Sequence, residues 1–149
     1  MERTGIDHQV QFAGDRDDQL FEKTSAPVEP LGYLSRPDLA EAFCRADCLV
    51  LPSRHDSFGR VVVEAMGTGL PVLLSDHVGA KEVIEQGETG WVVPVEDAEA
   101  LAEQMQWCIE HSEQVQSMRE VAVETAQKYS WTAYHKRARE AIASVVENH

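Results

Sequence analysis

The sequence lacks any apolar stretch long enough to cross a membrane, and it lacks a charged-then-apolar leader at its start. A spanning helix needs about 20 consecutive, mainly apolar residues, and no run here comes near that length. A leader would show a basic start followed by an apolar core. We therefore expect neither a transmembrane helix nor a signal peptide, and we expect a cytoplasmic protein.

Cysteine is also scarce. The three cysteines, Cys44, Cys48 and Cys108, are an odd number, which argues against a disulfide framework. Cys44 and Cys48 are four positions apart and would face one another across a helix turn, but neither has a second pair of ligands that zinc would need. We therefore expect reduced, structural thiols, as in a reducing compartment.

Basic residues are few: 13 Lys and Arg stand against 26 Asp and Glu, which gives a net charge of −13. Such a charge repels nucleic acids and anionic lipid surfaces, so we expect no nucleic-acid partner. It also repels phosphorylated ligands, so any phosphate site must rely on local donors. Many of the acids fall in residues 96–124, where we expect the solvated face of helices.

Length and pattern indicate one globular domain. A chain of 149 residues can bury roughly two thirds of its unfolded surface. Short apolar runs alternate with segments of helical spacing, which predicts a parallel α/β sheet with helices on both faces. The predicted strands are 9–14, 28–32, 48–51, 72–74 and 91–93, and the predicted helices are 15–23, 37–45, 60–66, 78–85, 98–109, 115–125 and 130–146.

The stretch 49–84 organises the chain. Its first apolar run stops at Pro52 and is followed by a polar loop and a helical segment from Arg60. Glycines at 67 and 69 close that helix, and Pro71 precedes the next apolar run. Strand, loop, helix and strand in this order predict a βαβ unit with parallel strands.

The chemistry of this unit lies in its loop and its first helical turns. Asp56 follows the carboxyl end of a strand, where open α/β sheets bind ligands. Glu64 lies in the helix, with seven residues between the two acids. Gly59 lets the backbone approach a ligand, and the free N–H groups of the helix start suit phosphate. A phosphate joined to a hydroxyl-rich group, a nucleotide-sugar, is the predicted ligand.

Several short motifs carry a resemblance to the donor-binding signature of retaining glycosyltransferases of family 4, which have the GT-B fold. These motifs are Pro52-Ser53, Asp56-Ser57-Phe58-Gly59, Glu64-Ala65-Met66, Gly69-Leu70-Pro71-Val72, Gly79-Ala80-Lys81-Glu82, Gly90-Trp91-Val92-Val93-Pro94 and Tyr129-Ser130-Trp131. The resemblance covers about residues 9 to 140 and implies the Rossmann-like C-terminal, donor-binding domain. Family members usually have glutamate at the first acid, where this chain has the shorter Asp56.

The resemblance implies roles for three side chains. Asp56 would be the catalytic residue that faces the donor sugar's hydroxyls, and Glu64 would accept hydrogen bonds from the ribose hydroxyls. Tyr33 would stack on the nucleotide base. The structural alternatives are an Asp56 that caps the following helix, a solvated Glu64 and an ordinary surface Tyr33.

The resemblance also assigns roles to the backbone between the two acids. Ser57, Phe58 and Gly59 would hold the sugar, and the amides of Arg60 and Val61 would meet the diphosphate. No Asp-x-Asp pair precedes the helix, so the resemblance implies that the amides take the role of a metal. We therefore expect neither a metal nor a cofactor besides the nucleotide-sugar substrate.

A whole GT-B transferase has two Rossmann-like domains, with the reaction in the cleft between them. The resemblance implies that residues 1–149 are one such half-domain, N-terminally incomplete and lacking its first strand together with its phosphate-binding Arg and Lys. We therefore expect an isolated chain that turns over poorly, an N-terminal domain or partner subunit, and an acceptor that the sequence leaves unknown. An exposed sheet edge would invite self-association.

Two other functions stay open. One is a non-catalytic or fragmentary donor-binding module that needs a partner half. The other is a different GT-B enzyme, such as a nucleotide-sugar epimerase or a phosphorylase. The spacing of Asp56 and Glu64 around Phe58-Gly59 favours the transferase, which moves a glycosyl group from a nucleoside diphosphate to an acceptor with its configuration retained.

Overall fold

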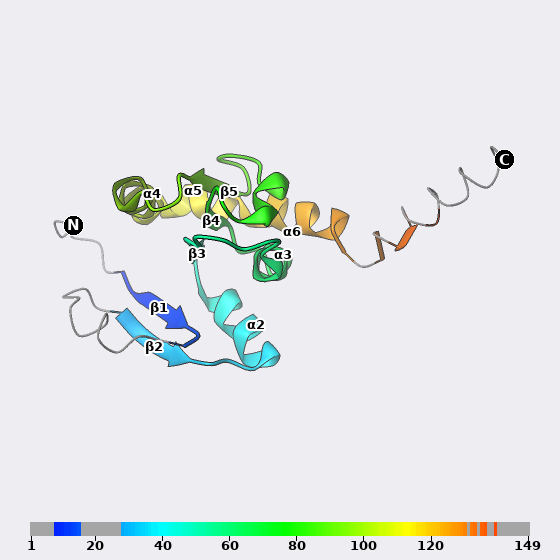
Figure 1. Cartoon of the computed structure of the whole chain (residues 1–149), viewed down its shortest axis with the longest axis horizontal. Helices are drawn as coiled ribbons and strands as arrows, with labels where there is room; N and C mark the ends of the chain where they lie inside the picture. The colour runs from blue at the N-terminus through cyan, green and yellow to red at the C-terminus, as the bar shows by residue number, and fades with distance from the viewer. Residues whose placement is uncertain (1–7, 16–27, 131, 134, 137–138, 140–149) are drawn as a thin grey trace.

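The computed structural model describes residues 8–15, 28–130, 132–133, 135–136 and 139, and these form an α/β fold (Figure 1). The predicted helix 15–23 and most of the predicted helix 130–146 lie outside the described residues. In chain order the elements are β1 (Val10–Ala13), β2 (Val28–Gly32), α2 (Arg36–Arg45), β3 (Leu49–Leu51), α3 (Arg60–Gly67), β4 (Val72–Ser75), the 3-10 helix η1 (Gly79–Val83), β5 (Gly90–Val93), α4 (Ala98–Glu110), α5 (Ser112–Ser117) and α6 (Arg119–Lys128).

The described strands pair in parallel, as predicted, but they form two sheets instead of one. One sheet has the order β3-β4-β5, with Leu49 opposite Val72 and Leu73 opposite Trp91. The other consists of β1 and β2. No ladder joins the two sheets within the described residues, and α2 leads from one sheet to the other and packs on α3 (Figure 1).

The three-stranded sheet carries a core on each face, which confirms the prediction of helices on both faces. Alternate residues of β4 point to opposite sides of the sheet. Val72 and Leu74 pack in a cluster that includes Val62 of α3 and Ala122 of α6. Leu73 packs in a second cluster with residues of α4 and α5. All four residues of β4 are buried, because the strand has a neighbour on each side and helices above and below.

The starts of α2 and α4 follow from short side chains that cap them. The Ser35 hydroxyl accepts a hydrogen bond from the Asp38 amide, and a proline follows in the first turn. The Asp97 carboxylate accepts from the Ala100 amide at 2.9 Å. Each cap satisfies a backbone donor that the first helical turn leaves unpaired.

Two predicted helices differ from the structure. The segment 115–125 is divided between α5 and α6, and the helix breaks at Met118, whose amide donates to Val115. The Ser117 hydroxyl donates to the Gln114 carbonyl at 2.7 Å, a local bond that competes with the helix backbone. The segment 78–85 contains only the 3-10 helix η1, because Val78 is held in a β-bridge with Asp56.

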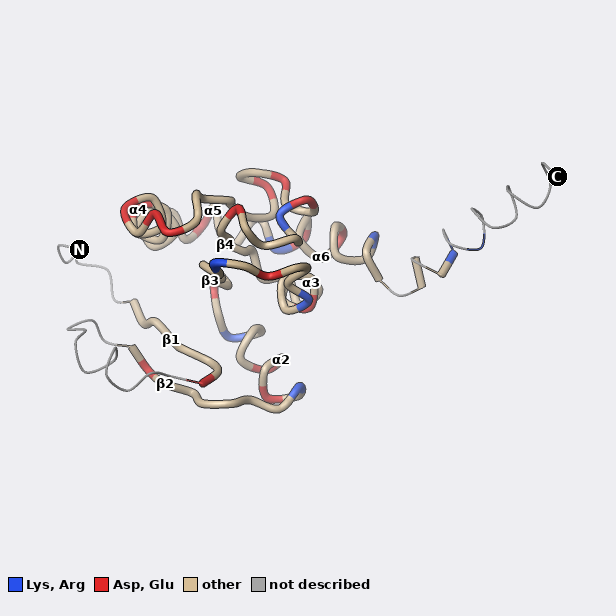
Figure 2. The backbone as a smooth tube through the Cα atoms, viewed as in Figure 1, with Lys and Arg blue, Asp and Glu red and all other residues tan. Residues whose placement is uncertain are grey.

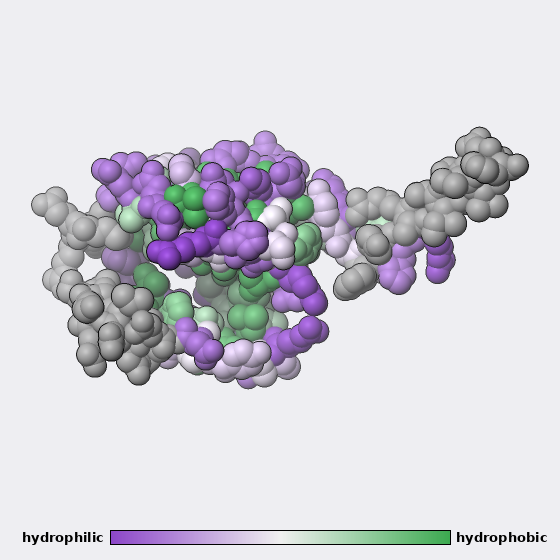
Figure 3. Space-filling model, in the orientation of Figure 1, coloured by the Kyte–Doolittle hydropathy of each residue, from purple (hydrophilic) through white to green (hydrophobic). Residues whose placement is uncertain are grey.

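The free side of β3 and the small β1–β2 sheet are much less covered than the rest. Each residue of β3 is only half-buried, and no residue of β1 or β2 is buried. Figure 3 shows a hollow between the β1–β2 sheet and the larger body, with hydrophobic residues inside it. The run Leu49-Val50-Leu51 carries no charge or proline of the kind that protects an edge strand. That a missing first strand leaves this edge open, and that the chain self-associates through it, both stay predictions.

No helix in the described part of the chain is long and apolar enough to span a membrane.

Candidate functional site

The candidate site lies at the carboxyl ends of β3 and β4, where two loops are bound to each other. The first loop contains Asp56, and the second contains His77 and Val78. The Asp56 amide donates to the His77 carbonyl at 3.2 Å, and the Gly79 amide donates to the Asp56 carbonyl at 2.9 Å. These bonds form a parallel bridge between Asp56 and Val78. The loop that precedes α3 is therefore fixed by the sheet.

The Asp56 side chain closes its own loop. Its Oδ1 atom accepts hydrogen bonds from the amides of Phe58 at 3.1 Å and Gly59 at 2.6 Å. The structural alternative for this residue, a cap on the following helix, is wrong: the N-cap of α3 is Gly59, and no side chain caps the helix. Oδ1 closes the loop that precedes the helix instead. The second oxygen, Oδ2, has no hydrogen-bond partner among the described residues, so one edge of the carboxylate remains available to a ligand.

Gly59 is required at the start of α3 for two reasons. Its φ of +76° lies in the left-handed region, which side chains other than glycine rarely adopt. A Cβ atom added there would also lie 2.7 Å from Cγ1 of Val78, which is closer than real contacts allow. The loop after β4 therefore packs directly on the backbone that turns into the helix.

The first amides of α3 form the most distinctive feature of the site. The Val62 amide donates to the Gly59 carbonyl at 2.9 Å. The amides of Arg60 and Val61, by contrast, have no acceptor in the part of the chain that the structure describes. Two unpaired donors at the positive end of a helix are suited to an anion such as phosphate.

The second acid, Glu64, lies one turn into α3 and is 45% exposed at its side chain. Its Oε1 lies 3.6 Å from a terminal nitrogen of Arg60, whose side chain is 61% exposed. An ion pair this exposed contributes about 0–1 kcal/mol, so a ligand can displace it at little cost. Glu64 is thus on the same short helix as the unpaired amides, and its only polar contact in the described part of the chain is the exposed pair with the Arg60 side chain.

The structure does not bring every predicted site residue together. Ser57 and Phe58 lie in the loop beside Asp56, and Phe58 is 48% exposed. Tyr33 follows β2 in the separate two-stranded sheet and is 88% exposed. The residues predicted to contact the sugar and the phosphates therefore lie together after β3, whereas the residue predicted to stack on the base lies in the other sheet's part of the chain.

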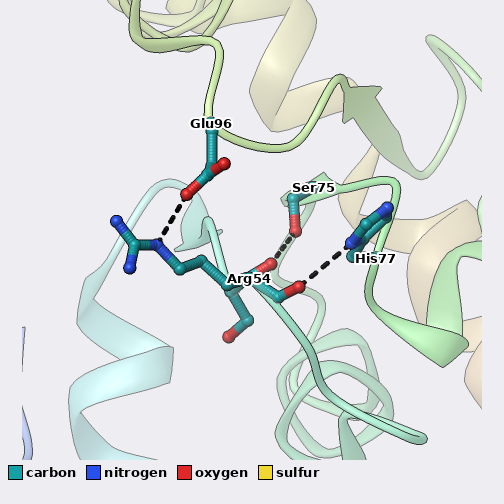
Figure 4. Close-up of polar contacts among 5 residues, drawn as sticks. Arg54, Ser75, His77 and Glu96 are labelled. Atoms are coloured by element: carbon teal, nitrogen blue, oxygen red, sulfur yellow. Dashed lines mark hydrogen bonds and ion pairs between the residues drawn. The ribbon is translucent and has the colours of Figure 1, made fainter.

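A polar network next to the site was not predicted from the sequence (Figure 4). Arg54 Nε lies 2.9 Å from a carboxylate oxygen of Glu96, and the His77 Nδ1 donates to the Arg54 carbonyl at 3.0 Å. The Ser75 hydroxyl donates to the Ser53 carbonyl. These contacts join the loops that follow β3, β4 and β5. Polar residues within three positions of the strand ends, Arg54 after β3, His77 after β4 and Glu96 after β5, were the signal in the sequence.

Charge around the site differs from that of the chain as a whole. Figure 2 shows acidic positions along α4, and basic positions near the end of β3 and on α3. Among the described residues, no three His, Cys, Asp or Glu side chains gather as a metal site would require. That no metal takes part stays a prediction.

Parallel strands with helices on both faces, and a helix that begins beside the carboxyl ends of the strands, define the class of Rossmann-like α/β domains. Residues 16–129, most of the chain, match the family model described as Glycosyl transferases group 1. The chain belongs to this family and is a glycosyl transferase group 1 domain.

Curated relatives agree with this assignment. The chain is 30% identical over 132 residues to the sulfoquinovosyl transferase SQD2 of Arabidopsis thaliana, with 83% of this chain and 26% of that protein covered. It is 40% identical over 93 residues to an uncharacterized 41.2 kDa protein in the cps region of Klebsiella pneumoniae, with 62% of this chain and 26% of that protein covered. The chain thus spans about a quarter of the length of these relatives.

Solved structures identify the fold as that of the C-terminal domain of a GT-B glycosyltransferase. Anabaena Alr3699/HepE in complex with UDP is 25% identical, with a TM-score of 0.79 over 91% of this chain and 41% of that one. Sucrose-phosphate synthase from Thermosynechococcus elongatus is 24% identical, with a TM-score of 0.78 over 95% of this chain and 39% of that one. A C-terminal domain of a group 1 family protein from Francisella tularensis is 19% identical, with a TM-score of 0.64 over 76% of this chain and 60% of that one.

Proposed function

We propose that this chain is the donor-binding domain, residues 1–149, of a retaining glycosyltransferase of family 4. It holds a nucleoside-diphosphate sugar at the carboxyl ends of β3 and β4, for transfer of the glycosyl group to an acceptor. The single observation that carries the proposal is the pair of unpaired amides, Arg60 and Val61, between the carboxylates of Asp56 and Glu64.

The diphosphate is the leaving group, and negative charge develops on it as the glycosidic bond breaks. The amides of Arg60 and Val61 are fixed donors that stabilise this charge without reorganising, because the loop before α3 is already bound to the sheet. The same amides make a metal unnecessary in this proposal. The chain's net charge of −13 opposes the binding of any anion, so these local donors carry the phosphate recognition.

The two acids recognise the hydroxyl-rich ends of the donor. Oδ2 of Asp56 accepts from a hydroxyl of the sugar, while Oδ1 continues to hold the loop. Glu64 leaves its exposed pair with Arg60 and accepts from the ribose hydroxyls. Tyr33 reaches the base only if the β1–β2 sheet approaches α3, so it contributes less than the acids in this proposal.

We take uridine as the first candidate for the base. HepE, 25% identical to this chain, is described in complex with UDP, and a further HepE structure in complex with UDP-glucose. The free thiols favour a cytoplasmic setting. The acceptor is bound by an N-terminal domain or a partner subunit in this proposal.

A second candidate is a donor-binding module without turnover of its own. The observation in its favour is that one oxygen of Asp56, the residue proposed to face the sugar, is already engaged by the amides of Phe58 and Gly59. Sugar transfer by the purified chain would exclude this candidate. Conversion of the donor without any acceptor would instead favour an epimerase.

The test is a thermal-shift titration with UDP, GDP and ADP. Ligand at about 100 times its dissociation constant should add about 2.7 kcal/mol of stability, which is several degrees for a domain of this size. We expect the largest shift with UDP. The Glu64→Ala variant should lose most of it, whereas Glu103→Ala, an exposed acid on α4, should keep it. If no nucleotide shifts the melting temperature, or if both variants behave alike, the proposal is wrong.

A further inference from the structure

The Lys and Arg side chains in the stretch 49–84 are held with different firmness. Arg54 is held in an ion pair at 2.9 Å, and Lys81 donates a hydrogen bond to a backbone carbonyl at 2.7 Å. The polar contact of the Arg60 side chain in the described part of the chain is its exposed pair with Glu64, whose 3.6 Å between nitrogen and oxygen is longer than a hydrogen bond. Arg60 is therefore the basic side chain of this stretch that a ligand can release most easily.

The first turn of α3 differs in charge from those of the other described α-helices. The first turns of α2, α4, α5 and α6 each contain an acid, which the positive end of a helix favours. The first turn of α3 contains no acid and begins with Arg60 instead. A cation at this end opposes the helix dipole but attracts an anion. The charge at the start of α3 thus suits a bound anion better than it suits the helix alone.

An anion at the first amides of α3 would lie beside Arg60. One of the two unpaired amides belongs to Arg60 itself, so a phosphate oxygen bound there would lie about 2.9 Å from its backbone nitrogen. Helical side chains lean toward the N-terminus of their helix, so both Arg60 and Glu64 extend toward this end of α3. A guanidinium binds phosphate through two parallel hydrogen bonds and brings a full positive charge, which a backbone amide lacks.

We propose that the Arg60 side chain is a phosphate ligand of the donor, and that its ion pair with Glu64 couples recognition of the ribose to recognition of the diphosphate. This inference rests on the proposed function, because it takes a nucleoside diphosphate as the ligand. In the free protein the two side chains engage each other. When the ribose hydroxyls bind Glu64, the guanidinium of Arg60 is released and turns to the diphosphate.

The pair makes the two halves of the nucleotide cooperate. A ligand that offers only a ribose, or only phosphates, breaks the pair and gains one contact in its place. A nucleoside diphosphate breaks the pair once and gains both contacts. Because an exposed pair is weak, the penalty on a half-ligand is about fivefold in affinity at most. The site therefore favours a nucleoside diphosphate over a nucleoside and over free diphosphate.

The test is an NMR titration of the isotope-labelled chain, which measures weak as well as tight binding. The ligands are UDP, or whichever nucleotide gives the largest thermal shift, its nucleoside, and inorganic pyrophosphate. Arg60→Ala should weaken the nucleoside diphosphate at least about tenfold, the effect of one hydrogen bond to a charged group. The nucleoside should bind this variant as well as it binds the wild type, or up to about fivefold more tightly, because Glu64 is free. A residue that only supports the fold of α3 would weaken both ligands alike.

The reciprocal variant is Glu64→Gln, which frees Arg60 in the absence of any ribose. It should bind inorganic pyrophosphate up to about fivefold more tightly than the wild type, although it binds the nucleoside diphosphate more weakly. Adding Glu64→Gln to Arg60→Ala should give no such gain over Arg60→Ala alone. A gain that persists without the Arg60 side chain would come from removing a negative charge, and it would overturn the coupling.

The matched control is Arg45→Ala, which removes the same charge. Arg45 forms an exposed pair with Glu41 at 2.8 Å, four residues apart on α2, so the two helices offer the same kind of pair. This variant should keep all three affinities within about twofold of the wild type. Arg60→Lys keeps the charge but not the planar fork, so its affinity for the nucleoside diphosphate should lie between those of Arg60→Ala and the wild type. The amide spectra show whether each variant is folded, and Arg60→Lys carries the test if Arg60→Ala is not.

The outcomes separate this inference from the proposed function. If the wild-type chain binds no nucleotide, the proposed function is wrong and the inference falls with it. If the wild type binds the nucleoside diphosphate and Arg60→Ala binds it equally well, the role of Arg60 alone is wrong. The same conclusion follows if Arg60→Ala weakens the nucleoside and the nucleoside diphosphate in the same proportion.

Discussion

The β3-β4-β5 body and the β1–β2 sheet are built from similar parallel strands but differ in how much they bury. Every residue of β4 is buried, and helices cover both faces of its sheet. No residue of β1 or β2 is buried. The bonds that fix the candidate site, between the loops after β3, β4 and β5, all lie in the body. The β3-β4-β5 body is thus packed well enough to hold a ligand site in place. The β1–β2 sheet has no buried residue that could do the same.

The largest expected difference between the two regions is in the free energy of unfolding lost when the same substitution is made in each. Leu74→Ala, in fully buried β4, should lower the free energy of unfolding by about 2–5 kcal/mol, because it leaves a cavity in the core. Leu31→Ala, in half-buried β2, should cost about 1 kcal/mol or less. Urea denaturation of both variants measures the two values. Equal losses would show that the β1–β2 sheet is packed as firmly as the body.

Two glycines test how closely the backbone is packed in each of the two regions. Gly59 and Gly32 have similar positive φ values, +76° and +68°, but only Gly59 has neighbours within 4 Å of an added Cβ. Gly32→Ala should therefore cost only the backbone strain, about 1 kcal/mol, and Gly59→Ala about 2–3 kcal/mol. The difference in unfolding free energy, again from urea curves, measures the contact with Val78. No difference would mean that Val78 moves aside freely.

The smallest expected effect is at the Arg54–Glu96 pair, whose side chains are 84% and 63% exposed. A double-mutant cycle with Arg54→Ala and Glu96→Ala should give a coupling energy of about 0.2–1 kcal/mol. High salt should reduce it further, because exposed charges are screened. A coupling well above this range would show that the pair holds the loops together, beyond what the β-bridge already does.

The elements that depend on local signals could be predicted from the sequence. The helix that begins beside Pro37, the apolar runs of β3 and β4, and the helix from Arg60 are where the pattern placed them. The sequence left two roles for Asp56, because a carboxylate before a helix can cap the helix or bind a ligand. The structure shows neither a cap nor a ligand contact: one oxygen closes the loop before the helix, whose N-cap is Gly59.

The contacts that the sequence did not reveal join residues far apart in the chain. Arg54 and Glu96 meet because β3 and β5 lie on either side of β4, and Cys48 and Cys108 pack against one apolar cluster because α4 covers that face of the sheet. The split into two sheets was missed for a similar reason. Alternation identifies β1 as a strand and a short apolar run identifies β3, but strand pairing depends on the neighbours that each strand finds.

The bridge between Asp56 and Val78 also has a kinetic consequence. Because the loop before α3 is bound to the sheet without a ligand, a nucleotide that binds as proposed would not have to wait for this loop to become ordered. Association should then proceed at the rate of encounter, slowed only by repulsion from the acidic surface. Nucleotides that differ in affinity for this domain would differ mainly in how long they stay.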